Sequence, residues 1–293
     1  MVCDICPRNC NIDRTQLTGL CGEKDEIRLA RAALHFWEEP CISGKSGSGT
    51  IFFSGCNLRC IYCQNRKIAS GLIGKTVTDE RLIEICYELK EKGANNINFV
   101  TPTHYTEKII KTIDTLKSKN FDLPFVWNTS GFEKPETIMK LKDRASIYLT
   151  DFKYLSPDLS KKYSNAYSYP EFAKKSLDIM VENSPDLIFK DGLLKKGVII
   201  RHLILPGHVD ASINVMSYLF SRYGNTVIYS IMNQYTPPSD IKLEYDNLNR
   251  KLTKYEYEKV VDHCLKLGIE NAYIQDGETQ KESFIPEFNY EGI

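Results

Sequence analysis

The sequence predicts an α/β fold, an open, partial (β/α)6 barrel with a small cysteine-rich extension at its N-terminus. The first observation behind this prediction is that apolar, strand-like runs alternate with longer helical stretches, six times in series, from about residue 50 onward. Such units build a parallel sheet with helices outside, and six are too few to close an eight-stranded barrel. The second observation is that the first 49 residues contain five cysteines but few strand-like runs.

The expected strands are rich in Val, Ile, Phe and Tyr and nearly continuous in apolar character, which is typical of parallel strands covered on both faces. They comprise residues 50–55, 96–101, 124–128, 146–152, 197–205 and 226–232, with a weaker seventh at 272–275. Active sites in such barrels lie at the C-terminal ends of the strands, so the chemistry is expected there.

The expected helices fill the gaps between these strands. The first, over residues 79–92, has Thr78 as its N-cap and stops at Gly93. The others comprise residues 105–119, 134–142, 169–182, 212–223 and 254–267, with Asp210 and Thr253 as caps of the last two. We therefore expect an extension over residues 1–49, a barrel core over 50–240, and a C-terminal helix and tail packed on the barrel over 241–293.

The charges of the chain balance, with 38 Lys plus Arg against 38 Asp plus Glu, which argues against nucleic-acid or anionic-membrane binding. No stretch approaches the ~18 apolar residues of a membrane span, and the N-terminus does not resemble a signal peptide. We therefore expect a cytoplasmic protein. In that compartment ten cysteines, eight of them within the first 63 residues, indicate metal ligands rather than disulfides.

The strongest signal for chemistry is the spacing C-x₃-C-x₂-C formed by Cys56, Cys60 and Cys63 directly after the first expected strand. Three thiolates on a short loop can hold three irons of a [4Fe–4S] cluster and leave the fourth iron open to a small molecule. The alternatives are a zinc knuckle or three core thiols. Zinc usually takes four ligands arranged in C-x₂-C pairs, and no nearby Cys or His completes this set.

The residues 55–65, Gly-Cys-Asn-Leu-Arg-Cys-Ile-Tyr-Cys-Gln-Asn, resemble the signature of the radical S-adenosylmethionine (SAM) superfamily. They are especially similar to the form found in pyruvate formate-lyase activating enzymes. Residues 3–10, 37–40, 233–235 and 275–293 extend the resemblance to an activating enzyme-like (PflX-type) branch. The resemblance implies a TIM-like partial barrel and an oxidoreductase that cleaves SAM reductively to a 5′-deoxyadenosyl radical for hydrogen abstraction.

The resemblance also implies partners. Flavodoxin or ferredoxin would supply the electron, and a glycyl radical enzyme or a peptide would be the substrate. Two alternatives stay open at this point: radical modification of another peptide, nucleoside or metabolite, and a non-catalytic iron–sulfur protein of electron transfer or sensing.

Residues near the strand ends are the expected SAM site. The resemblance implies that Tyr62 packs near the adenine, with a core aromatic as the alternative. Thr101, Thr103 and His104 replace the Gly-Gly-Glu of many radical SAM enzymes and offer two hydroxyls and a ring nitrogen, although His104 is also suited to helix capping or the surface. No catalytic residue is assigned.

Further along the chain, Asn128 and Ser130 follow the third strand and resemble the Asn-Gly segment of activating enzymes. Asp151 and Lys153 match their Asp-Leu-Lys motif, with Phe in the middle position, and are expected to point to one side of the strand. The resemblance implies that they bind the carboxylate or ribose of SAM, and an ion pair that holds the rim together is the alternative.

Two neighbouring cations, Arg201 and His202, lie on the fifth strand, where a buried charge needs a partner. The resemblance implies that one of them lies near SAM or substrate.

A second cysteine set precedes the barrel. The spacing of Cys3, Cys6, Cys10 and Cys21 suits zinc or a second iron–sulfur cluster. Four reduced surface thiols are the alternative, which is unfavourable for a segment with so little core. Cys86 and Cys264 fall on apolar helix faces and are expected to pack in the core.

Overall fold

The fold is built on a mostly parallel sheet, seen in a computed structural model that describes residues 2–238, 241–275 and 286–293. Its strand order is β10-β9-β8-β6-β5-β4-β2-β1-β3, and β7 pairs with β8. The parallel strands are β2 (Ser48–Phe53), β4 (Ile97–Val100), β5 (Phe125–Thr129), β6 (Ile147–Asp151), β8 (Leu193–Leu203), β9 (Ile228–Met232) and β10 (Ala272–Ile274). All seven predicted strands are confirmed. Within the described ranges the order runs along one path and does not close, as the prediction of an open barrel requires.

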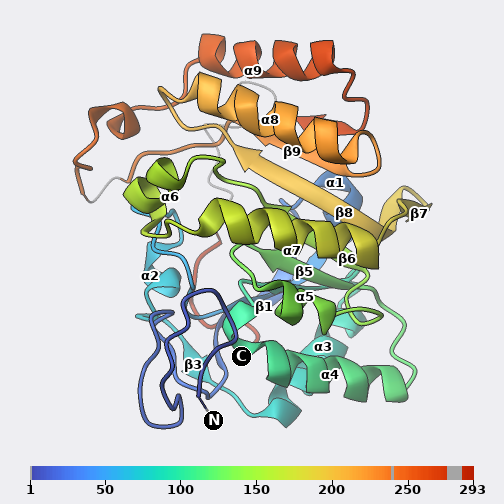
Figure 1. Cartoon of the computed structure of the whole chain (residues 1–293). Helices are drawn as coiled ribbons and strands as arrows, with labels where there is room; N and C mark the ends of the chain where they lie inside the picture. Colours follow the sequence, from blue (N-terminus) through green and yellow to red (C-terminus); the bar gives the residue numbers. More distant parts are fainter. Residues whose placement is uncertain (1, 239–240, 276–285) are drawn as a thin grey trace.

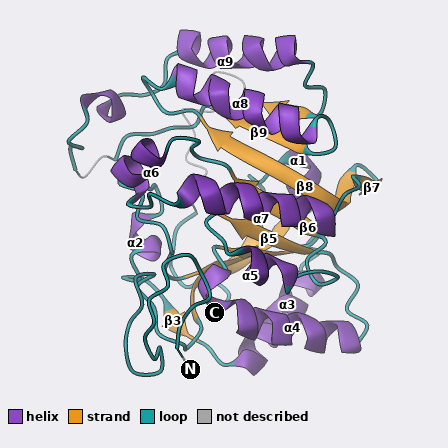
Figure 2. Ribbon diagram, viewed as in Figure 1, coloured by secondary structure: helices purple, strands orange, loops and turns teal. Residues whose placement is uncertain are grey.

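The six predicted helices are also present. They are α3 (Asp79–Glu91), α4 (Thr106–Ser118), α5 (Pro135–Met139), α7 (Tyr169–Asn183), α8 (Val209–Tyr223) and α9 (Lys254–Leu267). Figure 1 shows α4, α5, α7, α8 and α9 following one another from the bottom to the top of the view, and Figure 2 separates helices from strands by colour. Thr78 accepts a hydrogen bond from Arg81 N, and Thr253 forms a capping box with Glu256, so two of the three predicted caps are confirmed.

One predicted cap is wrong. Helix α8 begins at Val209 with His208 at its N-cap, so Asp210 lies in the first turn rather than before it. The turn Pro206-Gly207 ends the preceding segment earlier than expected. At its actual position the Asp210 carboxylate still lies near the positive end of the helix dipole.

The largest departure from the sequence prediction is strand β1 (Arg28–His35), which pairs antiparallel with β2. Its sequence, with two arginines and three alanines, has little β propensity, so the strand is stabilised mainly by its pairing with β2. The other unexpected elements are short: β3 (Lys75–Thr76), β7 (Ile188–Lys190), α1 (Pro40–Ser43), α2 (Arg66–Ala69), α6 (Pro157–Ser164), and the 3₁₀ turns η1 (Thr103–Tyr105) and η2 (Asp246–Asn249).

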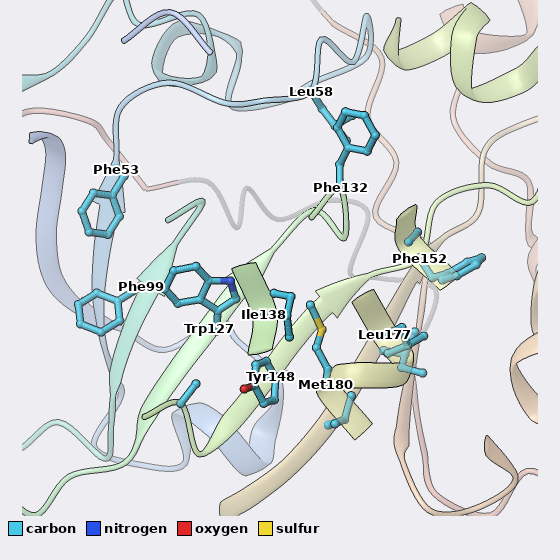
Figure 3. Close-up of a cluster of buried hydrophobic side chains, with 14 of the residues drawn as sticks. Phe53, Leu58, Phe99, Trp127, Phe132, Ile138, Tyr148, Phe152, Leu177 and Met180 are labelled. Atoms are coloured by element: carbon cyan, nitrogen blue, oxygen red, sulfur yellow. The ribbon is translucent and has the colours of Figure 1, made fainter. Parts of the chain in front are cut away.

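The two faces of the sheet differ. On the outer face Phe99, Trp127 and Tyr148 pack beneath Ile138 of α5 and Met180 of α7, as Figure 3 shows. On the inner face a separate apolar cluster near the strand starts joins α1 to the sheet; it contains Cys41, Ile42, Val126, Ile147, Leu149, Leu194, Ile199 and Ile228. Helix α1 therefore closes the inner face at the end where the parallel strands begin.

Side chains alternate between the two faces along each strand, so the last inward-facing residue of each strand lies at the carboxyl end, which α1 does not cover. Polar residues can occupy the inner face there. No helix in the described part of the chain is both long and apolar enough to span a membrane. Cys86 and Cys264 lie in the core, as predicted.

Candidate functional site

The three predicted cluster cysteines lie on the loop that follows β2. Gly55 opens this loop with φ +87°, and a Cβ there would lie 2.5 Å from Glu23 Cγ, so only glycine fits. Cys56, Cys60 and Cys63 are all half-buried, unpaired thiols. The amide of Leu58 donates to Cys56 Sγ at 3.4 Å, the kind of N–H···S contact that stabilises a thiolate.

The environment of these thiols disfavours a bare charge. Burial first, and then the neighbouring cysteines, raise the pKa of Cys56 to about 12 and that of Cys63 to about 11. Near neutral pH, Cys56 and Cys63 therefore stay protonated unless a cation compensates their charge. In the parts of the chain that the structure describes, no three or more His, Cys, Asp or Glu side chains form a set that could hold a single metal ion. The donor set of three thiols spread along one loop suits the separate corners of a cluster better than one zinc ion.

A network of charged and amide side chains lies on the inner face, at the same carboxyl edge of the sheet as the cysteine loop. Arg201 of β8 donates from Nε to Asp151 Oδ1 at 2.9 Å and from Nη2 to Asn128 Oδ1 at 2.6 Å. Lys153 Nζ donates to Asp151 Oδ2 at 2.6 Å. The structure thus brings together four of the predicted residues, from three neighbouring strands.

These side chains are set apart from the packed core by their partial exposure. Asp151, Lys153 and Arg201 keep 16–18% of their side-chain surface accessible. Burial acts to raise the pKa of Asp151, but Lys153 and Arg201 together hold it below its ordinary value. Asp151 in turn raises the pKa of Lys153 against the effect of burial. Both residues are therefore charged near neutral pH.

Lys153 also connects this network to the cysteine loop. Its charge lies close enough to lower the pKa of Cys56 and Cys63, against the larger effect of burial. The polar network therefore lies near the loop that carries the three thiols.

Glu38, for which the sequence predicted no role, also belongs to this network. It precedes α1, and its Oε1 accepts from Asn98 Nδ2 at 3.2 Å and Asn128 Nδ2 at 3.1 Å, while Arg201 Nη1 lies 3.3 Å from its Oε2. Burial raises its pKa, and Arg201 opposes that rise. The sequence contained one signal for Glu38, because segment 37–40 is part of the family resemblance. The resemblance implied no role for the carboxylates in that segment.

The other predicted residues lie elsewhere. His202 faces α8, opposite to Arg201, with Nδ1 2.7 Å from Phe152 O and Nε2 3.0 Å from Ser212 Oγ. Burial lowers its pKa to about 4. Tyr62 is buried in the core, with its hydroxyl 2.6 Å from Tyr154 OH.

The segment after β4 also bonds mostly to neighbouring loops. Thr103 Oγ1 donates to Glu133 Oε1 at 2.6 Å, and His104 Nε2 lies 2.6 Å from Ser54 O. Burial lowers the pKa of His104 to about 3. Thr101 stays half-buried with φ +58°, a left-handed conformation that is strained for a β-branched residue. Ser130 is half-buried, and its carbonyl accepts from Tyr169 OH at 3.0 Å.

The cysteines before the barrel gather close to the cluster loop. A Cβ on Gly19 would lie 3.3 Å from Cys21 Sγ and 3.8 Å from Cys10 Sγ, so these two sulfurs share one small region. Cys6 is buried, and burial raises its pKa to about 12. The Cys56 amide donates to Cys21 O at 2.9 Å. This segment therefore packs directly against the loop of the first cysteine set.

The fold and site together define a class: an open, parallel α/β barrel with three thiols after its first parallel strand and a polar network across its inner face. Residues 50–218 match the model of the radical SAM superfamily. The chain belongs to the radical SAM superfamily. Membership implies a [4Fe–4S] cluster and SAM and supports an enzyme, as the sequence predicted.

The chain is similar to several known proteins. The uncharacterized protein MJ0674 of Methanocaldococcus jannaschii is 31% identical over 279 residues, which cover 92% of this chain and 76% of that protein. Streptococcus suis SuiB bound to precursor peptide SuiA shares the fold, with a TM-score of 0.50 and 13% identity over 74% of this chain and 46% of that one. The maturase HydG from Carboxydothermus hydrogenoformans has a TM-score of 0.49 and 15% identity over 72% of this chain and 48% of its own. The chain thus spans about half the length of these two solved structures.

Proposed function

We propose that this chain is a radical SAM enzyme in which Cys56, Cys60 and Cys63 hold the [4Fe–4S] cluster and the polar network holds SAM. The observation that carries the proposal is the position of Asp151, Lys153 and their partners on the same edge as the three thiols. When bound, the cluster and SAM supply hydrogen abstraction that follows reductive cleavage of SAM.

The residues of the network have distinct tasks. Lys153 uses one of its three N–H donors on Asp151 and keeps others to bind a carboxylate such as that of SAM. Asp151 accepts from both Lys153 and Arg201 and so fixes their directions. Glu38 and Asn128 hold the guanidinium of Arg201 from its other side. The chain thereby offers a preorganised cation beside the cluster loop.

Replacing Lys153 by methionine is expected to weaken SAM binding at least about tenfold, because a lost charge-assisted hydrogen bond is worth about 1.5–3 kcal/mol. Equilibrium binding to the anaerobically reconstituted protein measures this effect. Lys161→Met, at an exposed position of α6, is the matched control and should bind as wild type does. Equal affinity of K153M and wild type would remove the network from the proposed SAM site.

For the substrate, we propose activation of a glycyl radical enzyme, as in the PflX-type, activating enzyme-like branch. The form of the cysteine motif supports it. Radical modification of another peptide is the second candidate, since SuiB, which shares the fold, was crystallised with a precursor peptide. A glycyl-radical EPR signal on a candidate partner, with flavodoxin or ferredoxin as reductant in the cytoplasm, tests the first candidate. Absence of the signal on all such partners would leave a different peptide, nucleoside or metabolite.

We also propose that Cys3, Cys6, Cys10 and Cys21 bind zinc or a second iron–sulfur cluster, for which the four thiols must move closer together than the structure places them. The shared position of the Cys10 and Cys21 sulfurs beside Gly19 supports it. The variant with all four cysteines replaced by alanine is expected to lose one zinc ion, or the iron of one cluster, per chain. The cluster held by Cys56, Cys60 and Cys63 should keep its iron. Metal counting on this variant and on Cys264→Ala, a buried control on α9, measures the loss. Unchanged zinc and iron would mean that these thiols carry no metal.

A further inference from the structure

A line of three hydroxyl groups leads from one cluster cysteine into the core. Cys60 Sγ lies 3.0 Å from Ser164 Oγ, the last residue of α6. Ser164 Oγ lies 2.9 Å from Tyr154 OH, which lies 2.6 Å from Tyr62 OH. All three hydroxyl-bearing residues are at most 6% exposed. This hydroxyl chain is therefore shielded from water.

The chemistry of a bound thiolate fixes the direction of these hydrogen bonds. An iron-bound sulfur can only accept, so Ser164 donates to Cys60. The serine oxygen then accepts from Tyr154, and Tyr154 accepts from Tyr62. A phenol ordinarily has a pKa of about 10, so both tyrosines are protonated donors near neutral pH. Hydrogen bonds in such a series polarise one another and strengthen the bond at the sulfur.

The backbone holds Ser164 in place. Ile61 N donates to Tyr163 O at 2.9 Å, and Arg59 N donates to Ser164 O at 3.3 Å, which ties the cysteine loop to the end of α6. Arg8 Nη2, from the N-terminal segment, donates to the same Ser164 carbonyl at 3.3 Å. The serine hydroxyl consequently has little freedom to leave Cys60.

We propose that Ser164, positioned by Tyr154 and Tyr62, sets the reduction potential of the cluster that Cys60 holds. This inference rests on the proposed function. A low-potential one-electron donor adds one electron to the cluster, and the added negative charge is shared by its sulfur ligands. A hydroxyl that donates to Cys60 Sγ stabilises this reduced state more than the oxidised one, and so raises the potential. Ser164 acts through Cys60 and is therefore a positioning residue.

An EPR-monitored redox titration of the full, anaerobically reconstituted chain, without SAM, tests the inference. In S164A the potential is expected to fall by about 59 mV, equivalent to a tenfold smaller ratio of reduced to oxidised cluster at a fixed potential. The potential should fall less in Y154F and least in Y62F, because these two tyrosines act on the cluster only through Ser164. The control S160A removes a buried hydroxyl of the same helix that donates to Pro157 O instead, and its potential should match wild type.

The outcomes separate this inference from the proposed function. If wild type binds no cluster, the proposed function fails and the inference fails with it. If S164A keeps its iron but its potential equals or exceeds that of wild type, or if S160A falls as far, the role of Ser164 is refuted alone. Should S164A lose the cluster through misfolding, an unchanged potential in Y154F refutes the hydroxyl chain, and a lowered one supports it.

Discussion

Replacing Cys60 by alanine is expected to abolish SAM cleavage, with 5′-deoxyadenosine falling to the level of a protein-free blank. The reason is that three thiols are the whole donor set of the loop, so loss of one leaves an iron corner without a ligand. The iron content of the reconstituted protein should fall in parallel. Both quantities are measured on the same anaerobic preparation.

The matched control is Cys86→Ala, which removes a thiol that is fully buried on α3 and away from the loop. It should keep the iron and the cleavage activity of wild type. An active Cys60→Ala protein, or equal losses in both variants, would contradict the assignment of the cluster to this loop.

Replacing Arg201 by methionine is expected to lower the free energy of unfolding of the metal-free protein by about 1.5–3 kcal/mol, since it leaves two partly buried carboxylates without a charged hydrogen-bond donor. Arg201 bonds to Asp151, Asn128 and Glu38 at once. Urea unfolding measures the loss. Arg222→Met is the control, because its partner Asp178 is paired at the surface and such a pair contributes at most about 1 kcal/mol.

The deficit of R201M should also depend on pH. Without Arg201 the pKa of Glu38, already raised by burial, rises further. A carboxyl with a higher pKa in the folded state takes up a proton on folding, so its stability contribution increases as pH falls. Asp151 acts in the same direction only below about pH 4, because its pKa is lowered from 3.8 and its contribution is fully present above that value. The loss in free energy of unfolding of R201M should therefore be largest at about pH 8 and shrink toward about pH 5. A loss that does not change with pH, or one no larger than that of Arg222→Met, would contradict the account of this network.

The sequence was sufficient to predict the parallel strands and the residues at their ends. Continuous apolar runs mark strands covered on both faces, and parallel strands bring their carboxyl ends to one edge. Asn128, Asp151, Lys153 and Arg201 are far apart in the chain and meet for this reason. Strand β1 was not predicted because its alanines and arginines give no strand signal. The place of Glu38 could not be predicted either, since β1 and α1, which flank it, bring it to the inner face.

Sequence alone could not decide between neighbours on one strand. Arg201 and His202 are adjacent, and alternation sends them to opposite faces, but which one faces inward depends on the register. The structure pairs Arg201 with Asp151 and turns His202 toward Ser212. Thr103 and His104 likewise bond to Glu133 and Ser54, partners that no local pattern reveals.

The most direct test of the central claim is an anaerobic assay of SAM cleavage by the reconstituted full-length chain with a strong reductant. The account predicts 5′-deoxyadenosine in wild type, none in Cys60→Ala, and a reduced amount in Lys153→Met at low SAM concentration. If wild type binds its cluster yet forms no 5′-deoxyadenosine under any of these conditions, the chain is a non-catalytic iron–sulfur protein and the claim is contradicted.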